Sequence, residues 1–347
     1  MLAAVYHGPN DLRVEQIQRP VIKPDEILLK MVCASICGTD LRILHGNHRL
    51  YPAGTIRIPG HELVGDIEEV GSEIKEVIIG QRFFIAPNIG CGHCRQCIAG
   101  FNNRCENYTA FGINIDGAFS EYVRIPAACI RQGNLIPIGM DVDPAVAALS
   151  EPLSCVLHGQ KPLNIRPGDR VLVMGAGPIG IIHMLLAKLQ GAARVWVSDM
   201  IPDRINQALS LGADRVIDLN TEDQNAVILN ETNGQGADVV IVAAPAHQAQ
   251  EAALQIAGIG GRINFFGGLP KDRPIINFDS NLVHYKELLV TATTACSTQD
   301  CVEASMIVNS KRIDLSPLVS AKYLLKDSIA AFATAENRKS LKVVITN

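Results

Sequence analysis

Apolar residues recur at two different spacings along the chain, and the change of spacing predicts two kinds of structure. From residue 1 to residue 90 the apolar runs are short, β-rich and separated by Pro, Gly and Asp, as in a small, mostly antiparallel, barrel-like domain. We expect strands there at 12–14, 26–32, 65–70 and 82–85. Further elements expected in this half are a short helix at Thr39–Leu44, a strand within 112–125 and a helical stretch from Asp141 to Leu149.

Strands and helices alternate regularly after the turn Arg166–Asp169, which is the pattern of a parallel sheet. Strands are expected near 171–174, 195–198, 215–219, 238–243, 262–266 and 288–294. Helices are expected near 202–212, 222–232 and 247–258. Six parallel strands in this order predict a Rossmann sheet and an α/β fold. The remaining residues predict helices at 300–309 and 327–336 and a last strand at 342–345.

A glycine loop, G-A-G-P-I-G, lies between the first of these strands and an apolar helical pattern that runs from Ile181 to Leu189. In this spacing the first glycine permits the turn, the second lets the backbone approach a pyrophosphate, and the third allows the helix to pack on the strand. The phosphates then lie at a helix N-terminus, where free N–H groups favour negative charge. The predicted nucleotide contacts are Gly175, Gly177, Pro178, Ile179 and Gly180.

The next strand ends at Asp199, nineteen residues beyond Gly180. A carboxylate at this position can accept hydrogen bonds from both ribose hydroxyls of NAD and would repel a 2′-phosphate. No basic side chain occurs between Asp199 and Arg204, so the sequence favours NAD over NADP. The alternative is a doubly wound domain that binds no nucleotide, because glycine turns also join ordinary strands and helices.

Composition and charge exclude several other classes of protein. The 347 residues suffice for about two domains with full cores. Lys and Arg number 31 and Asp and Glu 35, a formal charge of −4 without a basic block, so neither nucleic acid nor a membrane surface is expected as a partner. The N-terminus lacks the basic region of a signal peptide, and no apolar run approaches the roughly twenty residues of a bilayer span. We therefore expect a soluble, cytoplasmic protein.

Four of the ten cysteines form the pattern C-x2-C-x2-C-x7-C, at Cys91, Cys94, Cys97 and Cys105. Four thiolates on a short loop can close a tetrahedral shell without an open position, which is the pattern of a structural zinc site. An iron–sulfur cluster is the alternative metal centre, but its bacterial motif has a shorter last gap followed by proline. Four unrelated buried cysteines are the alternative without a metal. The clustering itself indicates a reducing compartment.

A longer pattern surrounds the first histidine–glutamate pair and consists of Gly60, His61, Glu62, Gly65, Gly71 and Ile74. With these residues the chain resembles the zinc-containing alcohol dehydrogenases of the medium-chain dehydrogenase/reductase superfamily. The sequences C-G-T-D at 37–40 and E-P-L at 151–153, the cysteine lobe and the glycine loop extend the resemblance over nearly the whole chain.

The resemblance implies a fold of two domains. A GroES-like, mostly antiparallel catalytic domain would cover 1–152 and carry the structural zinc lobe at 90–106. A Rossmann domain that binds NAD would cover 153–294, and 295–347 would return to the catalytic domain. Family members form dimers or tetramers through the last sheet strand, here within 288–294, so a homodimer or homotetramer is expected.

A catalytic zinc is also implied, with Cys37, His61 and Glu151 as ligands that leave a fourth position for an alcohol oxygen. Glu62 would be an exchangeable ligand or a group behind the metal. Neighbours in a strand point to opposite faces, so His61 and Glu62 both face the metal only if the turn at 59–60 distorts the backbone. Glu151 precedes a proline, and we expect it outside a helix.

Thr39 matches the hydroxyl through which the family relays the alcohol proton. Three residues further on, where liver-type enzymes have a histidine, this chain has Arg42, which cannot accept a proton. His45 or water is the expected substitute. Arg204 corresponds to a basic side chain that the family often places near the adenosine ribose.

The activity implied is oxidation of a secondary alcohol, a small molecule, by NAD at a zinc ion that lowers the pKa of the alcohol hydroxyl. Glu151 replaces the cysteine of liver-type enzymes, as in the branches that act on polyols and L-threonine, and a polyol such as sorbitol is the expected substrate. L-Threonine, 2,3-butanediol and a sugar-phosphate alcohol are alternatives. A non-catalytic nucleotide-binding homologue of the quinone oxidoreductase or lens crystallin type is the alternative from another class, which the presence of both ligand sets disfavours.

Overall fold

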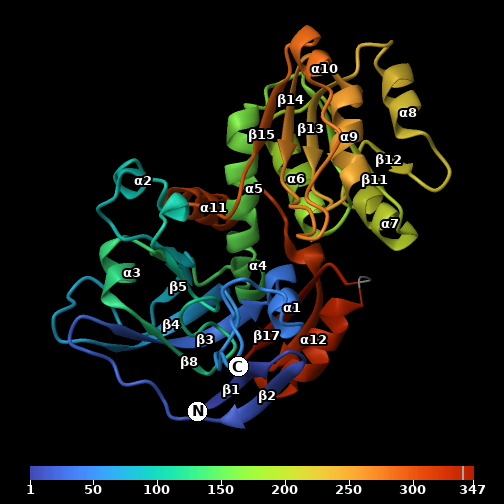
Figure 1. Cartoon of the computed structure of the whole chain (residues 1–347). Helices are drawn as coiled ribbons and strands as arrows, with labels where there is room; N and C mark the ends of the chain where they lie inside the picture. The colour runs from blue at the N-terminus through green and yellow to red at the C-terminus, as the bar shows by residue number, and fades with distance from the viewer. Residues whose placement is uncertain (338–339) are drawn as a thin grey trace. The chain divides into compact units, whose positions relative to one another are not determined.

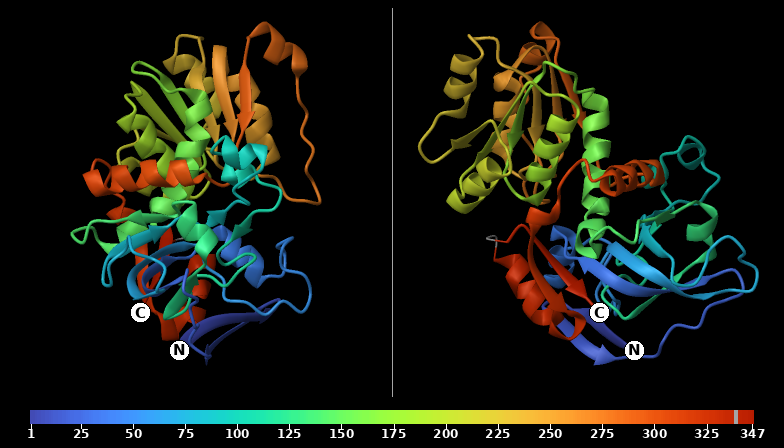
Figure 2. Two further views of the ribbon diagram at one scale, coloured as in Figure 1. Left: turned by 90° about the vertical axis from the view of Figure 1, so that its left-hand side faces the viewer. Right: turned by 180° about the vertical axis from the view of Figure 1, so that it is seen from behind.

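The computed structural model describes residues 1–337 and 340–347, which form two compact units (Figure 1). The first unit comprises Met1–Ser154 and Cys296–Asn347 and therefore holds both ends of the chain (Figure 2). The second unit is Cys155–Ala295. Among the described residues, no helix combines the length and the apolar character that a bilayer span requires.

A seven-stranded sheet is the framework of the first unit. Six of its strands follow one another in the order β16 (Val319–Leu324), β17 (Lys342–Thr346), β3 (Ile27–Ser35), β4 (Glu62–Val70), β5 (Arg82–Ile85) and β9 (Leu135–Pro137), and β8 (Tyr122–Ile125) also pairs with β3. Only β16 and β17 are parallel, so the predicted mostly antiparallel sheet is confirmed. Two small sheets pair β1 (Leu2–Gly8) with β2 (Asp11–Gln16) and β6 (Asn88–Ile89) with β7 (Thr109–Ala110).

Short helices fill the connections of the first unit. They are α1 (Gly38–Leu44), α2 (Arg95–Ile98), α3 (Ala127–Arg131), α4 (Pro144–Ala148), α11 (Thr298–Ser310) and α12 (Ser328–Glu336), with 3-10 turns at Asn102–Arg104, Ser316–Leu318 and Leu325–Asp327. Helix α4 begins three residues later than the expected start at Asp141. Asp143 caps it by accepting a hydrogen bond from the Ala145 N–H, and Pro144 takes the first helical position, where no N–H is needed.

The second unit is a parallel sheet between helices. The strand order is β12 (Arg215–Asp218), β11 (Arg194–Asp199), β10 (Arg170–Met174), β13 (Ala237–Val242), β14 (Ala257–Phe265) and β15 (Leu289–Ala292), so the predicted Rossmann sheet is confirmed. Its helices are α6 (Pro178–Leu189), α7 (Pro202–Ser210), α8 (Gln224–Glu231), α9 (His247–Ile256) and α10 (Ser280–Tyr285), with a 3-10 turn at Lys161–Leu163. Helices α6 and α7 pack on β10, β11 and β12, while α9 packs on β13 and β14 and has α8 beside it (Figure 1).

The expectation that Glu151 lies outside a helix is wrong. Glu151 belongs to the first turn of α5 (Ser150–Gln160). Pro152 is tolerated there because the N–H groups of a first turn have no partner within the helix, so a missing one removes no helical hydrogen bond. The hydrogen bond from the Leu153 N–H to Leu149 O, at 3.1 Å, joins α5 to the end of α4.

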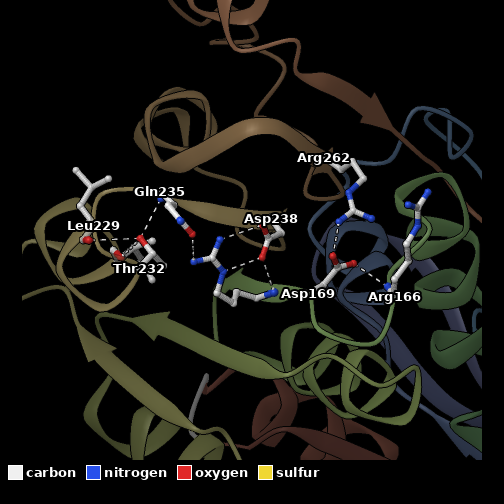
Figure 3. Close-up of polar contacts among 10 residues, drawn as sticks. Arg166, Asp169, Leu229, Thr232, Gln235, Asp238 and Arg262 are labelled. Carbon is white, nitrogen blue, oxygen red and sulfur yellow. Dashed lines mark hydrogen bonds and ion pairs between the residues drawn. The ribbon is translucent and has the colours of Figure 1, made fainter.

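Charged side chains connect the amino-terminal ends of the parallel strands (Figure 3). Arg170 on β10 donates two side-chain hydrogen bonds to Asp238 on β13, from Nε at 2.8 Å and from an Nη at 3.1 Å. Arg262 on β14 lies 2.8 Å from Asp169, whose carboxylate also accepts a hydrogen bond from the Arg166 N–H. Burial acts to raise the pKa of Asp238, but the hydrogen bonds and charge of Arg170 outweigh it and lower that pKa.

Asp238→Asn should reduce the free energy of unfolding by about 1–2 kcal/mol, because it removes the charge of a partly exposed carboxylate and leaves one acceptor oxygen for the three N–H groups of Arg170 that Asp238 binds. Since the folded-state pKa is lowered, the contribution is present above the ordinary aspartate pKa of about 3.9 and is lost as the pH falls below it. Urea titrations at several pH values measure the effect. Asp272→Asn is the matched control, because Asp272 is 77% exposed and lies 3.8 Å from Arg273. Equal shifts in both variants would contradict the assignment.

Candidate metal centres and nucleotide site

Four cysteines converge in the lobe between β6 and β7. The sulfurs of Cys91, Cys94, Cys97 and Cys105 all lie within 4.8 Å of one another. Backbone N–H groups point at three of them, from Cys94 to Cys91 Sγ at 3.4 Å, from Cys97 to Cys94 Sγ at 3.5 Å and from Cys91 to Cys105 Sγ at 3.4 Å. A Cβ atom on Gly90 would lie 2.5 Å from Cys97 Sγ, so only glycine fits there. This donor set fits a closed tetrahedral zinc site.

The thiols of the lobe differ in acidity. The N–H groups of His93 and Cys94 lower the pKa of Cys91 to about 6. Burial raises the pKa of Cys97 to about 12. His93 itself is exposed, and its Nδ1 lies 3.0 Å from the Cys91 carbonyl oxygen.

A second group of metal-ligating atoms is formed by Cys37, His61 and Glu62, which lie within 4.8 Å of one another. Cys37 immediately precedes α1, and the other two residues stand where β4 begins. Gly60 has a φ of +100°, a conformation that favours glycine, and it turns the backbone just before His61. This turn allows the consecutive side chains of His61 and Glu62 to approach the same sulfur.

Asp40 holds the two segments of this group together. Its side chain is fully buried. One carboxylate oxygen accepts a hydrogen bond from the Cys37 N–H at 2.8 Å, and the other accepts one from the Gly60 N–H at 3.1 Å and lies 3.5 Å from His61 Nδ1. Burial by itself favours the neutral imidazole, but the charges of Asp40 and Cys37 raise the pKa of His61 well above its ordinary value. The group therefore attracts positive charge.

A buried lysine from the end of the chain reaches Glu62. Lys342 Nζ donates hydrogen bonds to Glu62 Oε1 at 2.7 Å, to Glu62 Oε2 at 2.6 Å and to the Ile36 carbonyl at 3.1 Å. The strand register explains the contact, because Ser35 of β3 is paired with both Glu62 and Val344, which places Lys342 on the same face two residues from Val344. Burial favours the neutral amine, but the charges of Glu62, Cys37 and Glu151 raise the pKa of Lys342.

Glu151 lies outside the group formed by Cys37, His61 and Glu62. A carboxylate oxygen of Glu151 lies within 4.8 Å of the Cys296 sulfur. Its charge nevertheless contributes to the raised pKa of Lys342, so it belongs to the same electrostatic environment.

Thr39 and His45, the two residues considered for the proton relay, have different surroundings. Thr39 Oγ1 accepts a hydrogen bond from the Arg42 guanidinium at 3.0 Å. His45 is exposed, and its two ring nitrogens lie 2.8 Å from Asn10 Oδ1 and 2.6 Å from Glu336 Oε1. The structure thus places His45 in a surface cluster and not among the metal-ligating atoms.

The glycine loop of the second unit has the geometry that its spacing predicts. Gly175 has a φ of +108°, and a Cβ on Gly180 would lie 1.7 Å from the Gly175 oxygen, so the helix can approach the turn only without a side chain there. Gly177 precedes α6, with Pro178 in its first turn and Ile179 next. A Cβ on Gly177 would lie 3.7 Å from an Nη of Arg204, which places that guanidinium beside the loop.

Asp199 is fixed at the end of β11 by the backbone. Its Oδ2 accepts a hydrogen bond from the Ala176 N–H at 2.7 Å, and its Oδ1 accepts from the Met200 and Ile201 N–H groups at 2.7 and 2.9 Å. The carboxylate is therefore held in place beside the glycine loop, where a nucleotide ribose would meet it.

Two residues of the first site were not identified from the sequence. Asp40 belongs to the C-G-T-D sequence at 37–40, but its contact with the segment 60–61 depends on tertiary structure. Lys342 was treated as part of a strand. The one local signal is a lysine inside the apolar run L-K-V-V-I, since a charged residue in a buried strand needs a partner.

Comparison with known proteins identifies the family. Residues 23–135 match the alcohol dehydrogenase GroES-like domain, and residues 178–310 match the zinc-binding dehydrogenase domain. The chain is 31% identical over 337 residues to L-threonine 3-dehydrogenase of Chromobacterium violaceum, covering 96% of both chains.

Solved structures agree with this result. A zinc-binding dehydrogenase of Sinorhizobium meliloti 1021 bound to NADP matches with a TM-score of 0.92 at 29% identity, covering 100% of this chain and 99% of that one. An alcohol dehydrogenase of Escherichia coli CFT073 complexed with NADH matches with a TM-score of 0.90 at 25% identity and the same coverage. The predicted GroES-like and Rossmann fold, the zinc requirement and the dinucleotide cofactor are thereby confirmed. The chain belongs to the zinc-binding alcohol dehydrogenase family, whose members are NAD(P)-dependent oxidoreductases of the medium-chain dehydrogenase superfamily.

Proposed function

We propose that this dehydrogenase oxidises a secondary alcohol with NAD at a zinc ion held by Cys37, His61 and one glutamate. The observation that carries the proposal is that the Cys37 sulfur, a His61 ring nitrogen and a Glu62 oxygen lie within 4.8 Å of one another in surroundings that favour positive charge. When bound, zinc in such a site acts as a Lewis acid that lowers the pKa of the alcohol hydroxyl. The four lobe cysteines would hold a second, structural zinc.

The third protein ligand is proposed to be Glu151. Glu62 is nearer to Cys37 and His61, but both of its oxygens accept hydrogen bonds from Lys342, which competes with a metal for them. Glu62 then stays behind the metal and supplies negative charge. Glu151 lies in the first turn of α5, and its charge acts on Lys342, which supports a place for its carboxylate near the site.

Thr39 is proposed to accept the alcohol proton and pass it to water. Its hydroxyl already accepts a hydrogen bond from Arg42, which leaves its own proton available to a second acceptor. His45 is not included in this proposal, because Asn10 and Glu336 occupy the surroundings of both its ring nitrogens.

NAD is proposed as the cofactor in preference to NADP. The carboxylate of Asp199 is fixed next to the glycine loop, and a 2′-phosphate at the ribose would be repelled by it. Arg204 lies beside Gly177 and is proposed to contact the nucleotide from the other side of the loop. The second unit would therefore bind the nucleotide, and the first unit would carry the chemistry.

L-Threonine is the substrate that we propose, with a polyol as the second candidate. The matched relative from Chromobacterium violaceum is named L-threonine 3-dehydrogenase. Residues 41–61 contain three arginines and three histidines but no aspartate or glutamate, in a chain of net charge −4. This segment joins the metal-ligating Cys37 and His61, so it favours a substrate with a carboxylate. The polyol is supported by the E-P-L motif at 151–153, which both branches share.

A homodimer or homotetramer in the cytoplasm completes the proposal. Strand β15 is the edge of the parallel sheet, and Leu289 is 47% and Ile259 85% exposed nearby. An open edge with apolar side chains favours pairing with another chain. The structure holds all ten cysteines as thiols and none in a disulfide, which suits a reducing compartment. A monomeric mass for the intact chain in solution would contradict the oligomer.

Zinc analysis tests the metal sites. Wild-type protein should contain about two zinc ions per chain, and Glu151→Ala about one, with NAD⁺ reduction lost, because a catalytic site needs three protein ligands. Glu76→Ala, at an exposed position of the same unit, is the control and should retain both ions and full turnover. A single zinc in the wild type, unchanged in Glu151→Ala together with turnover, would contradict the assignment.

A substrate panel tests the specificity. With NAD⁺, L-threonine should be turned over faster than sorbitol or 2,3-butanediol, and NADP⁺ should support little activity. Arg42→Leu should raise KM for L-threonine by about 10–100-fold, the equivalent of one charge-assisted hydrogen bond, while KM for the neutral diol stays unchanged. Arg95→Leu, an exposed residue of the cysteine lobe, is the control. Faster turnover of sorbitol with no effect of Arg42→Leu would favour the polyol.

Lys342→Met tests the buried ion pair. The substitution leaves the Glu62 carboxylate buried without its partner and should reduce the free energy of unfolding by about 3–5 kcal/mol. Glu62→Gln combined with Lys342→Met should recover part of this loss, because no unpaired charge remains. Urea unfolding of the zinc-free and zinc-loaded forms gives both values. Lys322→Met is the control, since Lys322 is 54% exposed and its pair with Asp143 is at the surface. Equal effects at 342 and 322 would refute the role of the pair.

A further inference from the structure

Two cysteines outside the four-cysteine lobe face each other at the start of α11. Cys296 Sγ and Cys301 Sγ are 3.6 Å apart, and each residue is 1% exposed. The structure holds both residues as reduced thiols. Neither belongs to the four-cysteine lobe or to the group of Cys37, His61 and Glu62, but Cys296 shares a further group of possible ligand atoms with Glu151.

The backbone between the two thiols is fixed. Ser297 caps α11 by accepting a hydrogen bond from the Asp300 N–H, and the Asp300 carboxylate accepts from the Ser297 N–H at 2.8 Å. The Cys301 N–H donates to the Ser297 carbonyl at 3.1 Å. On the other side, Asn88 Nδ2 donates to the Cys296 carbonyl at 3.0 Å. These bonds keep the sulfurs close to each other.

The thiols also lie between the two candidate metal sites. Cys296 Sγ is within 4.8 Å of a carboxylate oxygen of Glu151. The Thr298 N–H donates to Asn102 Oδ1 at 2.9 Å, and Asn102 stands between the third and fourth cysteines of the lobe. A change in the bonding of Cys296 would therefore be felt next to Glu151.

We propose that Cys296 and Cys301 form a redox modification site, at which a peroxide produces a reversible disulfide that lowers turnover. The sulfur of one cysteine attacks a peroxide oxygen, the O–O bond breaks, and a sulfenic acid and one water form. The second thiol attacks the sulfenic sulfur, the S–S bond forms, and the oxygen leaves as a second water. Two thiols are oxidised to a disulfide and one hydrogen peroxide is reduced to two waters. A dithiol reductant reverses the step by exchange.

The burial of the pair determines which reagents reach it. Both thiols are inaccessible in the closed structure, so reaction requires local opening of the first turn of α11. Hydrogen peroxide needs little more room than a water molecule, whereas alkylating reagents are larger. The pair should consequently react with peroxide while it resists alkylation. The effect on turnover rests on the proposed role of Glu151, but formation of the disulfide does not.

The sequence provides a direct assay. Trypsin cleaves after Lys286 and Lys311, and the peptide between them contains Cys296 and Cys301 and no other cysteine. The zinc-loaded protein is exposed to graded hydrogen peroxide, denatured, alkylated with N-ethylmaleimide and digested. We expect this peptide to lose two hydrogens and to take up no N-ethylmaleimide, at peroxide concentrations that leave zinc content unchanged. Uptake of two alkyl groups at concentrations that already release zinc would overturn the proposal.

Variants separate the disulfide from its effect on activity. In Cys301→Ser and Cys301→Ala no disulfide can form within this peptide, so peroxide should carry Cys296 past the sulfenic acid to the sulfinic and sulfonic acids. Dithiothreitol does not reduce these acids, so the part of the turnover lost with them should not return. Cys129→Ser is the matched control, because Cys129 is fully buried and belongs to neither metal group nor this pair. In wild type, turnover should fall in proportion to the disulfide and return on reduction. A disulfide that forms without loss of turnover would overturn the regulatory part, whereas an inactive unoxidised enzyme would count against the proposed function alone.

Discussion

The first unit of this molecule depends on one buried ion pair, between Glu62 and Lys342. The residues are 280 positions apart, and their side chains are 1% and 5% exposed. Removal of two charges from water costs several kcal/mol per ion, and only good geometry with further hydrogen bonds offsets it. Here the ammonium group uses its three N–H donors on the two oxygens of Glu62 and the Ile36 carbonyl. The last strand of the chain is thereby attached to the strand that begins at the metal-ligating residues.

Close backbone packing also fixes the turn at Gly60, next to His61. A Cβ on Gly112 would lie 2.4 Å, and one on Gly117 2.1 Å, from the oxygen of Gly60, so the loop 112–117 can lie against that turn only with glycine at both positions. The Gly60 N–H is already bound by Asp40. Gly60 is thus held by the hydrogen bond from its N–H and by the close packing around its oxygen. Donors that are fixed before a ligand arrives do not have to be ordered by it.

The sequence predicts contacts between residues that are close together in the chain, and it does not predict contacts between distant segments. The glycine loop and Asp199 act within one strand–turn–helix unit, and the four lobe cysteines lie on one short loop, so spacing alone indicates their contacts. The strand order of the second unit also follows from short, regular connections. The sequence does not predict the contacts of Lys342 and Asp40, because their partners lie in segments that are brought together only by the folded structure. Glu151 lies inside a helix because the preference of a residue before proline for an extended backbone does not exclude the first turn of a helix.

The charges around Cys37 explain why these donors suit a cation and why one lysine is needed among them. The charges of Asp40 and Cys37 raise the pKa of His61, and those of Glu62, Cys37 and Glu151 raise the pKa of Lys342. A field that draws a proton to the imidazole draws a divalent ion more strongly, because the Coulomb energy scales with charge. The same ring nitrogen cannot hold both, so a metal must displace the proton. Without Lys342 the site would be more negative and would bind a divalent ion more strongly. The same unpaired negative charge would also oppose folding. The ammonium group on Glu62 therefore limits the negative charge to what a folded, metal-free site can bear.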